Sequence, residues 1–277
     1  MGLQHKAALQ ENSRNALALA IEKRDADTIK MVEAAVRHRH VLLAYQPIVQ
    51  AANPGRTAFY EGLIRVLDET GRVIPAKDFI HAVEETETGR LLDCIALDKG
   101  LRALESQPAL RLSINMSARS IGYKKWMRTL QRGLARNPTV GERLILEITE
   151  SSAMLVPEIV VGFMQDLQGK GISFALDDFG AGYTAFRHFK DFQFDILKID
   201  GQFITGIARD PDNQVLTRAM LAVAQQFDMF TVAERVERAE DAAFLQTLGV
   251  NCMQGYFYGA PTVCPPWEKE TVERASA

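Results

Sequence analysis

The feature that most constrains the fold of this chain is a series of short apolar runs that each end in a chemically active polar side chain. The clearest run, Ile172 to Gly180, reads ISFALDDFG and closes on two adjacent aspartates. The other runs end at Asn115, Glu147, Lys198 and Asp200, Glu234, and Gln254. In an α/β barrel, side chains at the carboxyl ends of the strands meet at one mouth, so this repeated placement predicts a barrel with its active site there.

Strand-like and helix-like segments alternate from residue 77 onward, as in a parallel sheet with crossover helices. The expected strands cover 110–116, 143–149, 171–177, 195–199, 229–234 and 251–254, and the expected helices cover 77–107, 119–136, 157–169, 182–189, 213–227 and 239–248. Two extended runs, 41–50 and 57–67, come first and are separated by a turn predicted from Asn-Pro-Gly. The number of alternating strand and helix segments and the length of 277 residues favour a TIM-like (β/α)8 barrel over an open sheet.

Side-chain alternation along these strands predicts how the mouth is supported. Residues two apart in a strand share a face, so Ala175 lies below Asp177 and Ile196 lies below Lys198. If this face points into the barrel, a packed layer of apolar side chains supports the polar ends.

The chain divides into a leader, a barrel and a tail. We predict a helical leader over residues 1–40, which are rich in Ala, Leu, Glu, Lys and Arg and contain no proline, a barrel over 41–265, and a tail over 266–277. The leader has no apolar core of a secretory signal, and no uncharged run reaches the ~18 residues of a membrane span.

Charge and cysteine usage exclude some partners and compartments. A formal net charge of −3 argues against long nucleic acids as partners, although local cations could hold a small anionic ligand. The three cysteines are scattered without a CxxC pair, which fits a reducing compartment. We therefore expect a cytoplasmic protein.

The polar ends form an oxygen-rich set that suits hard divalent cations. The set comprises Glu61, Asn115, Glu147, Asp177, Asp178 and Glu234, and none of the five histidines lies at a strand end. Oxygen ligands favour Mg²⁺ or Mn²⁺ over zinc, and so many carboxylates would repel one another without cations. Two such ions about 4 Å apart suit phosphodiester hydrolysis, with Lys198 orienting water, Glu234 taking its proton and Arg65 holding a phosphate oxygen.

Plainer explanations exist for each residue taken singly. Asp178 alone would be a helix N-cap, Lys198 alone half of an ordinary salt bridge, and His38 and His40 part of a solvated face. The coincidence of six oxygen-bearing ends and a lysine favours a functional site over these explanations.

The same residues resemble the EAL-domain cyclic di-GMP phosphodiesterases over about residues 41–262. The motifs that carry the resemblance are YQPIV at 45–49, EGLIR at 61–65, SINMS at 113–117, LEITE at 146–150, DDFGAGY at 177–183, LKID at 197–200, AERVE at 233–237 and QGYF at 254–257.

The resemblance implies a fold, a reaction and a set of site residues. The implied fold is a (β/α)8 barrel whose first strand is antiparallel, and the implied reaction is hydrolysis of cyclic di-GMP to linear pGpG with two Mg²⁺ or Mn²⁺ ions. By position, the metal ligands would be Glu61, Asn115, Glu147, Asp177 and Asp178. Lys198 and Glu234 would orient and deprotonate water, and Glu150 would brace the loop after Asp178. The substrate contacts would be Gln46, Arg65, Glu237 and Gln254.

Several positions depart from the family pattern, including Arg238 in place of a threonine and the segment 85–90, and none of them removes an implied metal ligand. Gly62 replaces an alanine, Ala181 replaces a threonine, and Arg235 replaces the glycine after Glu234. A bulky cation at 235 could clash if the backbone there needs a positive φ, which would favour a cyclic di-GMP receptor that cleaves slowly or not at all. Unrelated metal-dependent barrel chemistry, such as proton abstraction beside a carboxylate, is a third alternative.

Two interaction surfaces are expected besides the site. A homodimer could form through the loop following Asp178, and residues 1–40 could bind a regulatory partner.

Overall fold

The computed structural model describes residues 23–182 and 189–268, which form two compact units. The first unit combines the chain up to Leu42 with Arg65–Leu91. The second unit combines Leu43–Ile64 with the chain from Leu92 onward, and it contains the barrel.

The first unit contains the described part of the predicted N-terminal helix. Residues 23–37 are helical, and the turn that ends the helix contains Arg39, whose φ of 61° is left-handed. The end of β2 (Asn53–Leu67) pairs antiparallel with β3 (Val73–Pro75), and η1 (Ala76–Asp78) and α2 (Ile80–Val83) follow. The leader residues 1–22 lie outside the described residues.

Eight strands form a closed barrel. They are β1 (Val41–Gln50), β2, β4 (Leu112–Asn115), β5 (Leu144–Thr149), β6 (Ser173–Phe179), β7 (Ile196–Ile199), β8 (Phe230–Ala233) and β9 (Cys252–Gln254). Their order is β1-β9-β8-β7-β6-β5-β4-β2, and β1 also pairs with β2. β1 is antiparallel to β9, whereas the pairs from β2–β4 to β8–β9 are parallel. The predicted TIM-like barrel with an antiparallel first strand is therefore confirmed.

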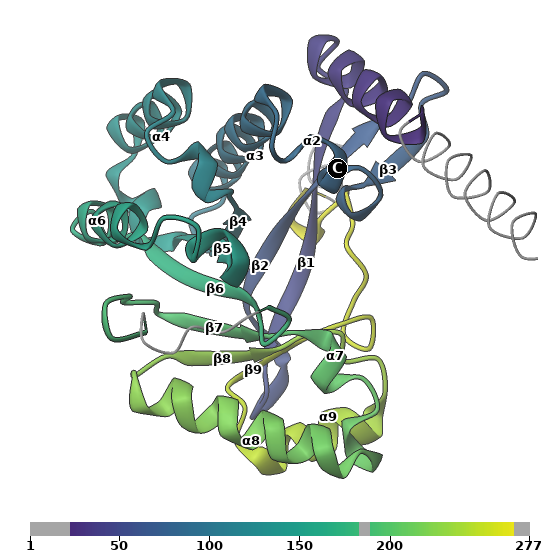
Figure 1. Ribbon diagram of the computed structural model, residues 1–277, viewed down its shortest axis with the longest axis vertical. Coiled ribbons are helices and arrows are strands. Elements are labelled where there is room, and N and C mark those ends of the chain that lie inside the picture. The colour runs from purple at the N-terminus through teal and green to yellow at the C-terminus, as the bar shows by residue number, and fades with distance from the viewer. Residues whose placement is uncertain (1–22, 183–188, 269–277) are drawn as a thin grey trace, which may run out of the picture. The chain divides into compact units, whose positions relative to one another are not determined.

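Helices of the second unit lie outside these strands, as Figure 1 shows for α4, α6, α8 and α9. The helical elements are α3 (Glu87–Ser106), η2 (Ala118–Ser120), α4 (Lys124–Arg136), η3 (Pro138–Arg143), α5 (Glu150–Ala153), α6 (Pro157–Gln168), α7 (Gly201–Ile204), η5 (Ile207–Arg209), α8 (Pro211–Gln226) and α9 (Ala239–Leu248). Proline at the first position starts α6 and α8, where its missing N–H costs no helical hydrogen bond. In α4, Trp126 and Leu130 are buried on one face.

A layer of apolar side chains packs beneath the carboxyl ends of the strands. The layer comprises Ile48, Phe59, Ile145, Ala175, Ile196 and Val232. Each of the last five lies two residues before a polar end on the same strand face, as Ile196 precedes Lys198. The opposite face packs into the larger core under the helices, with Leu146, Leu176 and Leu197 fully buried. Side-chain alternation thus places the polar ends above a packed support, as predicted.

Several predicted boundaries differ from the structure. The single helix expected over 77–107 is divided into η1, α2 and α3. The Thr86 hydroxyl donates a hydrogen bond to Val83 O between α2 and α3, which competes with helical bonding. β2 begins at Asn53, so the turn is confined to Ala51 and Ala52. Most of the helix expected at 182–189 lies outside the described residues.

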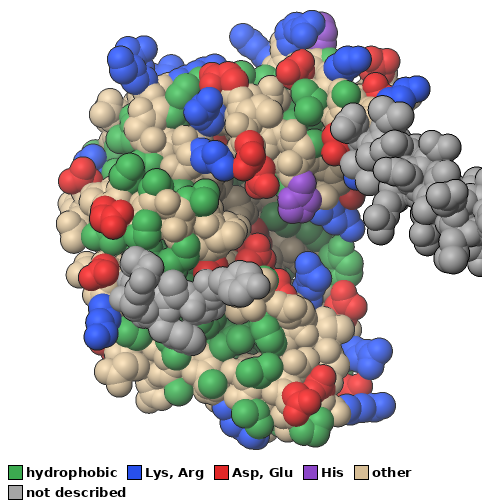
Figure 2. All heavy atoms as spheres, in the orientation of Figure 1, with side chains coloured by type: hydrophobic (Ala, Val, Ile, Leu, Met, Phe, Trp, Pro, Cys, Tyr) green, Lys and Arg blue, Asp and Glu red, His purple; other side chains and the backbone are tan. Residues whose placement is uncertain are grey.

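Charged side chains of both signs are interspersed over the face drawn in Figure 2. Within the described residues, none of the helices has both the length and the apolar character needed to cross a membrane.

Candidate functional site

Lys198 on β7 is the centre of a buried cluster of charges at the carboxyl ends of the barrel strands. Its Nζ lies 2.8 Å from Glu147 Oε2, 2.8 Å from Glu234 Oε1, 2.9 Å from Asp177 Oδ1 and 3.5 Å from Glu61 Oε2. The lysine side chain is 1% exposed, so these carboxylates take the place of its hydration. The barrel thus brings together residues from β2, β5, β6, β7 and the end of β8.

The carboxylates outnumber the lysine, and their pKa values reflect this imbalance. Burial lowers the pKa of Lys198, but Asp177 and Glu147 outweigh that effect and raise it well above its usual value. Burial raises the pKa of Glu234 to about 8 despite the opposing charge of Lys198. Burial, together with the charge of Asp177, also raises the pKa of Asp178 to about 6. The site therefore favours proton or cation uptake.

The pKa values of Glu61 and Glu147 are shifted in opposite directions within the same cluster. Burial raises the pKa of Glu147 well above its usual value, and the charge of Glu61 adds to the increase. Burial also acts to raise the pKa of Glu61, but Lys198 and hydrogen bonds from Gln254 and Asn115 lower it overall. Glu61 is therefore the better stabilised anion of the two.

Amide side chains orient Glu61. Asn115 Nδ2 donates to Glu61 Oε1 at 2.8 Å, and Gln254 Nε2 donates to Glu61 Oε2 at 2.6 Å. Gln254 Nε2 also lies 3.0 Å from Gln46 Oε1, and Gln46 Nε2 donates to Gly259 O. This network joins β1, β2, β4 and β9 across the closure of the barrel.

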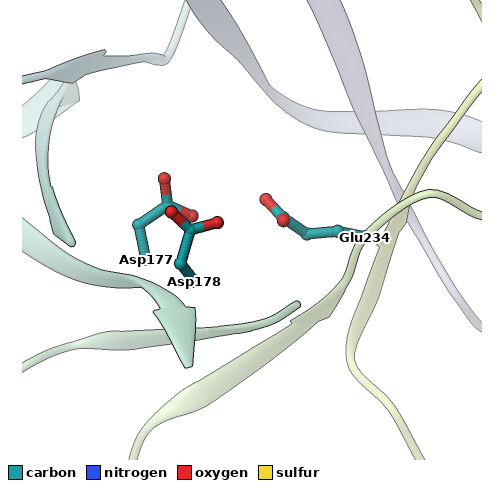
Figure 3. A group of neighbouring side chains, drawn as sticks. All are labelled: Asp177, Asp178 and Glu234. Carbon is teal, nitrogen blue, oxygen red and sulfur yellow. The ribbon is translucent and has the colours of Figure 1, made fainter. Parts of the chain in front are cut away.

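Asp177, Asp178 and Glu234 point their carboxylates toward one another, as Figure 3 shows. One oxygen from each lies within 4.8 Å of the others. Asp178 adopts a left-handed φ of 55° at the end of β6, and Glu150 Oε2 accepts a hydrogen bond from the N–H of Gly180 in the turn that follows. This turn orients the two successive aspartates toward Glu234.

The donor set fits a divalent cation. Glu147 Oε1 is buried and accepts no hydrogen bond within the described part of the chain, and the same is true of Gln254 Oε1. Buried oxygens without partners are costly unless a cation or water satisfies them. Oxygen donors in this arrangement suit Mg²⁺ or Mn²⁺.

Two further predicted substrate contacts are Glu237 and Arg65. Glu237 is exposed in the segment after β8. Arg65 belongs to the first unit, where it is opposite Pro75 in the β2–β3 register. The roles of Glu237 and Arg65 in substrate binding remain predictions. Dimerisation through the loop following Asp178 also remains a prediction, because residues 183–188 of that loop lie outside the described residues.

One acidic residue of this region was not among the predicted site residues. Asp200 is buried, caps α7 through a hydrogen bond from Gln202 N, and adds to the effects of burial and Asp177 that raise the pKa of Asp178. Asp200 lies two residues after Lys198 in the LKID motif, and this position is the signal by which the sequence could have identified it.

A family comparison matches residues 29–261 of the chain to the EAL domain. The chain is 29% identical over 258 residues to the cyclic di-GMP phosphodiesterase PdeF of Escherichia coli, covering 91% of this chain and 34% of that protein. It is 30% identical over 255 residues to PdeR of the same organism, covering 87% and 37%. The chain thus spans about a third of the length of these curated relatives.

Solved structures show the same barrel. The PaMucR phosphodiesterase in complex with c-di-GMP matches with a TM-score of 0.78 at 28% identity, covering 88% of this chain and 99% of that one. The FimX EAL domain from Pseudomonas aeruginosa bound to c-di-GMP matches with a TM-score of 0.77 at 23% identity, covering 86% and 97%.

Proposed function

The chain belongs to the EAL domain family, and on this premise we propose that it hydrolyses one phosphodiester bond of cyclic di-GMP to give linear pGpG. The observation that carries the proposal is the buried contact of Lys198 with Glu147, Asp177 and Glu234. A site that only bound the dinucleotide would not need a lysine surrounded by carboxylates at this depth. The curated relatives named as cyclic di-GMP phosphodiesterases support the choice of substrate.

The oxygen donors of the cluster would hold two Mg²⁺ or Mn²⁺ ions. The proposed ligands are Glu61, Asn115, Glu147, Asp177 and Asp178. When bound, such ions neutralise these charges and polarise a phosphoryl oxygen. Glu234 lies close enough to Asp177 and Asp178 to share in this binding.

The chain's own groups divide the remaining work. Lys198 Nζ orients the attacking water and stabilises the negative charge that develops on the phosphate. Glu234, whose Oε1 lies 2.8 Å from Lys198 Nζ, is placed to accept the proton of that water. Glu150 positions the turn after Asp178 through its hydrogen bond with Gly180 N.

Four further residues are proposed to bind the nucleotide. Gln46 and Gln254 are buried at the barrel closure, and their amides are joined by one hydrogen bond. Arg65 would hold a phosphate oxygen, and the exposed Glu237 would accept hydrogen bonds from a guanine edge.

The direct test incubates the purified protein with cyclic di-GMP and Mg²⁺ or Mn²⁺, with and without a chelator, and separates the nucleotides. We expect pGpG that disappears with the chelator and with the Asp177→Asn variant. Tight binding of cyclic di-GMP without product would instead support the second candidate, a receptor of the same fold. Arg235, a bulky residue at a left-handed position beside Glu234, is the observation that raises this candidate, although the space at Gly201 accommodates its side chain.

A further inference from the structure

Arg235 occupies a backbone conformation that usually belongs to glycine. Its φ is 52°, a left-handed conformation that is strained for a residue with a side chain. The neighbouring peptides hold it there, because Glu234 N donates to Ile199 O at 3.2 Å and Val236 N donates to Gln254 O at 2.9 Å. The turn after Glu234 is thus tied to β7 on one side and to β9 on the other.

The Arg235 side chain avoids a clash because residue 201 has no Cβ. A Cβ placed on Gly201 would lie 2.2 Å from Arg235 Cδ, 2.5 Å from Cγ and 2.7 Å from Cβ. Gly201 itself has no left-handed φ, so the backbone of α7 does not require glycine there. The stem of Arg235 is the reason that residue 201 must be small.

This contact joins the two segments that carry the proposed catalytic pair. Gly201 follows Asp200 at the end of β7, three residues after Lys198, and Arg235 follows Glu234 directly. The guanidinium is exposed and makes no ion pair or hydrogen bond with the described residues, so the aliphatic stem rather than the charge makes the contact.

We propose that Arg235 is a positioning residue whose stem, seated on Gly201, holds the turn after Glu234 and keeps the Glu234 carboxylate against Lys198. The catalytic consequence rests on the proposed function. A displacement of about 1 Å at a reacting group costs up to ~10²-fold in rate, so a Cβ forced between these segments should be visible in kcat.

The test compares Gly201→Ala, Arg235→Gly and the double variant with the wild-type protein. Gly201→Ala should lower kcat about tenfold or more while changing KM less than about threefold. Arg235→Gly alone should lower kcat about three- to tenfold, because the turn loses the stem, and in the double variant it should restore kcat to within about threefold of that single variant. Gly162→Ala on α6 is the matched control, because a Cβ there meets nothing within 4 Å.

A second readout does not depend on turnover. The rise in melting temperature on adding Mn²⁺ reports the arrangement of Asp177, Asp178 and Glu234, and it should fall in Gly201→Ala and recover in the double variant. Arg235→Met keeps a stem of similar shape without the charge and should behave as the wild-type protein in both assays.

Three outcomes would overturn the proposal. They are a Gly201→Ala variant as active and as Mn²⁺-responsive as Gly162→Ala, a loss that Arg235→Gly does not relieve, and an Arg235→Met variant that behaves as Arg235→Gly. If Gly201→Ala does not fold, recovery of folding in the double variant supports the contact. A wild-type protein that binds but does not cleave cyclic di-GMP would overturn the proposed function, while the melting shifts would still decide the role of Arg235.

Discussion

Replacing Lys198 with methionine should destabilise the metal-free protein far more than the loss of an ordinary ion pair. The substitution keeps the length of the side chain but removes the cation that lies within 3.5 Å of four carboxylates. Those carboxylates would then be buried with excess negative charge, and at least one must take up a proton for the barrel to remain folded.

The magnitude follows from two independent arguments. Removing one partner of a buried ion pair costs about 3–5 kcal/mol. The folded variant can instead relieve the excess charge by protonating one glutamate, which costs about 5 kcal/mol at pH 8 for an ordinary pKa. The loss of stability therefore cannot be much larger than this value. The cost of this protonation falls by about 1.4 kcal/mol for each unit by which the pH is lowered. The loss of stability caused by Lys198→Met should therefore shrink to about 1 kcal/mol at pH 5.

Urea unfolding in chelator at pH 8, 6.5 and 5 measures this deficit as a change in the free energy of unfolding. Arg102→Met is the matched control, because Arg102 Nε also lies 2.8 Å from a carboxylate oxygen, on Asp98, but is exposed. Its loss should be under about 1 kcal/mol at every pH. A Lys198→Met deficit no larger than that of Arg102→Met, or one that grows as the pH falls, would refute the reasoning.

Three further predictions concern buried titratable groups, two at the Lys198 cluster and one, Asp93, on α3. Glu147→Gln should raise the metal-free stability by about 1 kcal/mol or more, since the raised pKa of Glu147 means that its carboxyl costs free energy either to protonate or to bury as an anion, and the amide avoids both. The variant should also lose most hydrolysis, as melting in chelator and product formation would report. Lys198→Ala should lower kcat at least ~10²-fold with a much smaller change in cyclic di-GMP affinity, and equal losses would assign the lysine to ground-state binding. Burial raises the pKa of Asp93 to about 6, so the folded state holds its proton more tightly than the unfolded chain. The free energy of unfolding should therefore fall by about 2 kcal/mol from pH 4 to pH 6, and Asp93→Asn should flatten this slope in urea titrations.

Much of the barrel could be predicted from the sequence because its signals are local. Period-two alternation places Ile196 under Lys198 and Ala175 under Asp177 whatever the rest of the chain does. α9 occupies the predicted range of 239–248, and the other crossover helices described lie near theirs. The long helix expected over 77–107 is instead divided, and a side-chain hydrogen bond that periodicity does not reveal, from Thr86 to Val83 O, lies between α2 and α3.

Contacts between distant parts of the chain were decided by the tertiary structure. Closing the barrel brings Gln254 to Gln46, 208 residues away, and to Glu61, and no local pattern encodes that pairing. The environment of Lys198 likewise depends on strand register, which sets how many carboxylates surround one ammonium group.

Arg235 shows most clearly the difference between what neighbouring residues encode and what long-range packing decides. The sequence identified a bulky residue after Glu234 and predicted a clash if the backbone there had a positive φ. The structure has that positive φ without the clash, because Gly201 leaves room for the stem. The amino-acid sequence therefore determined which chemical groups end each strand, since side-chain alternation is a property of neighbouring residues. Their partners depended on how separate strands pack together, which is a property of the whole barrel.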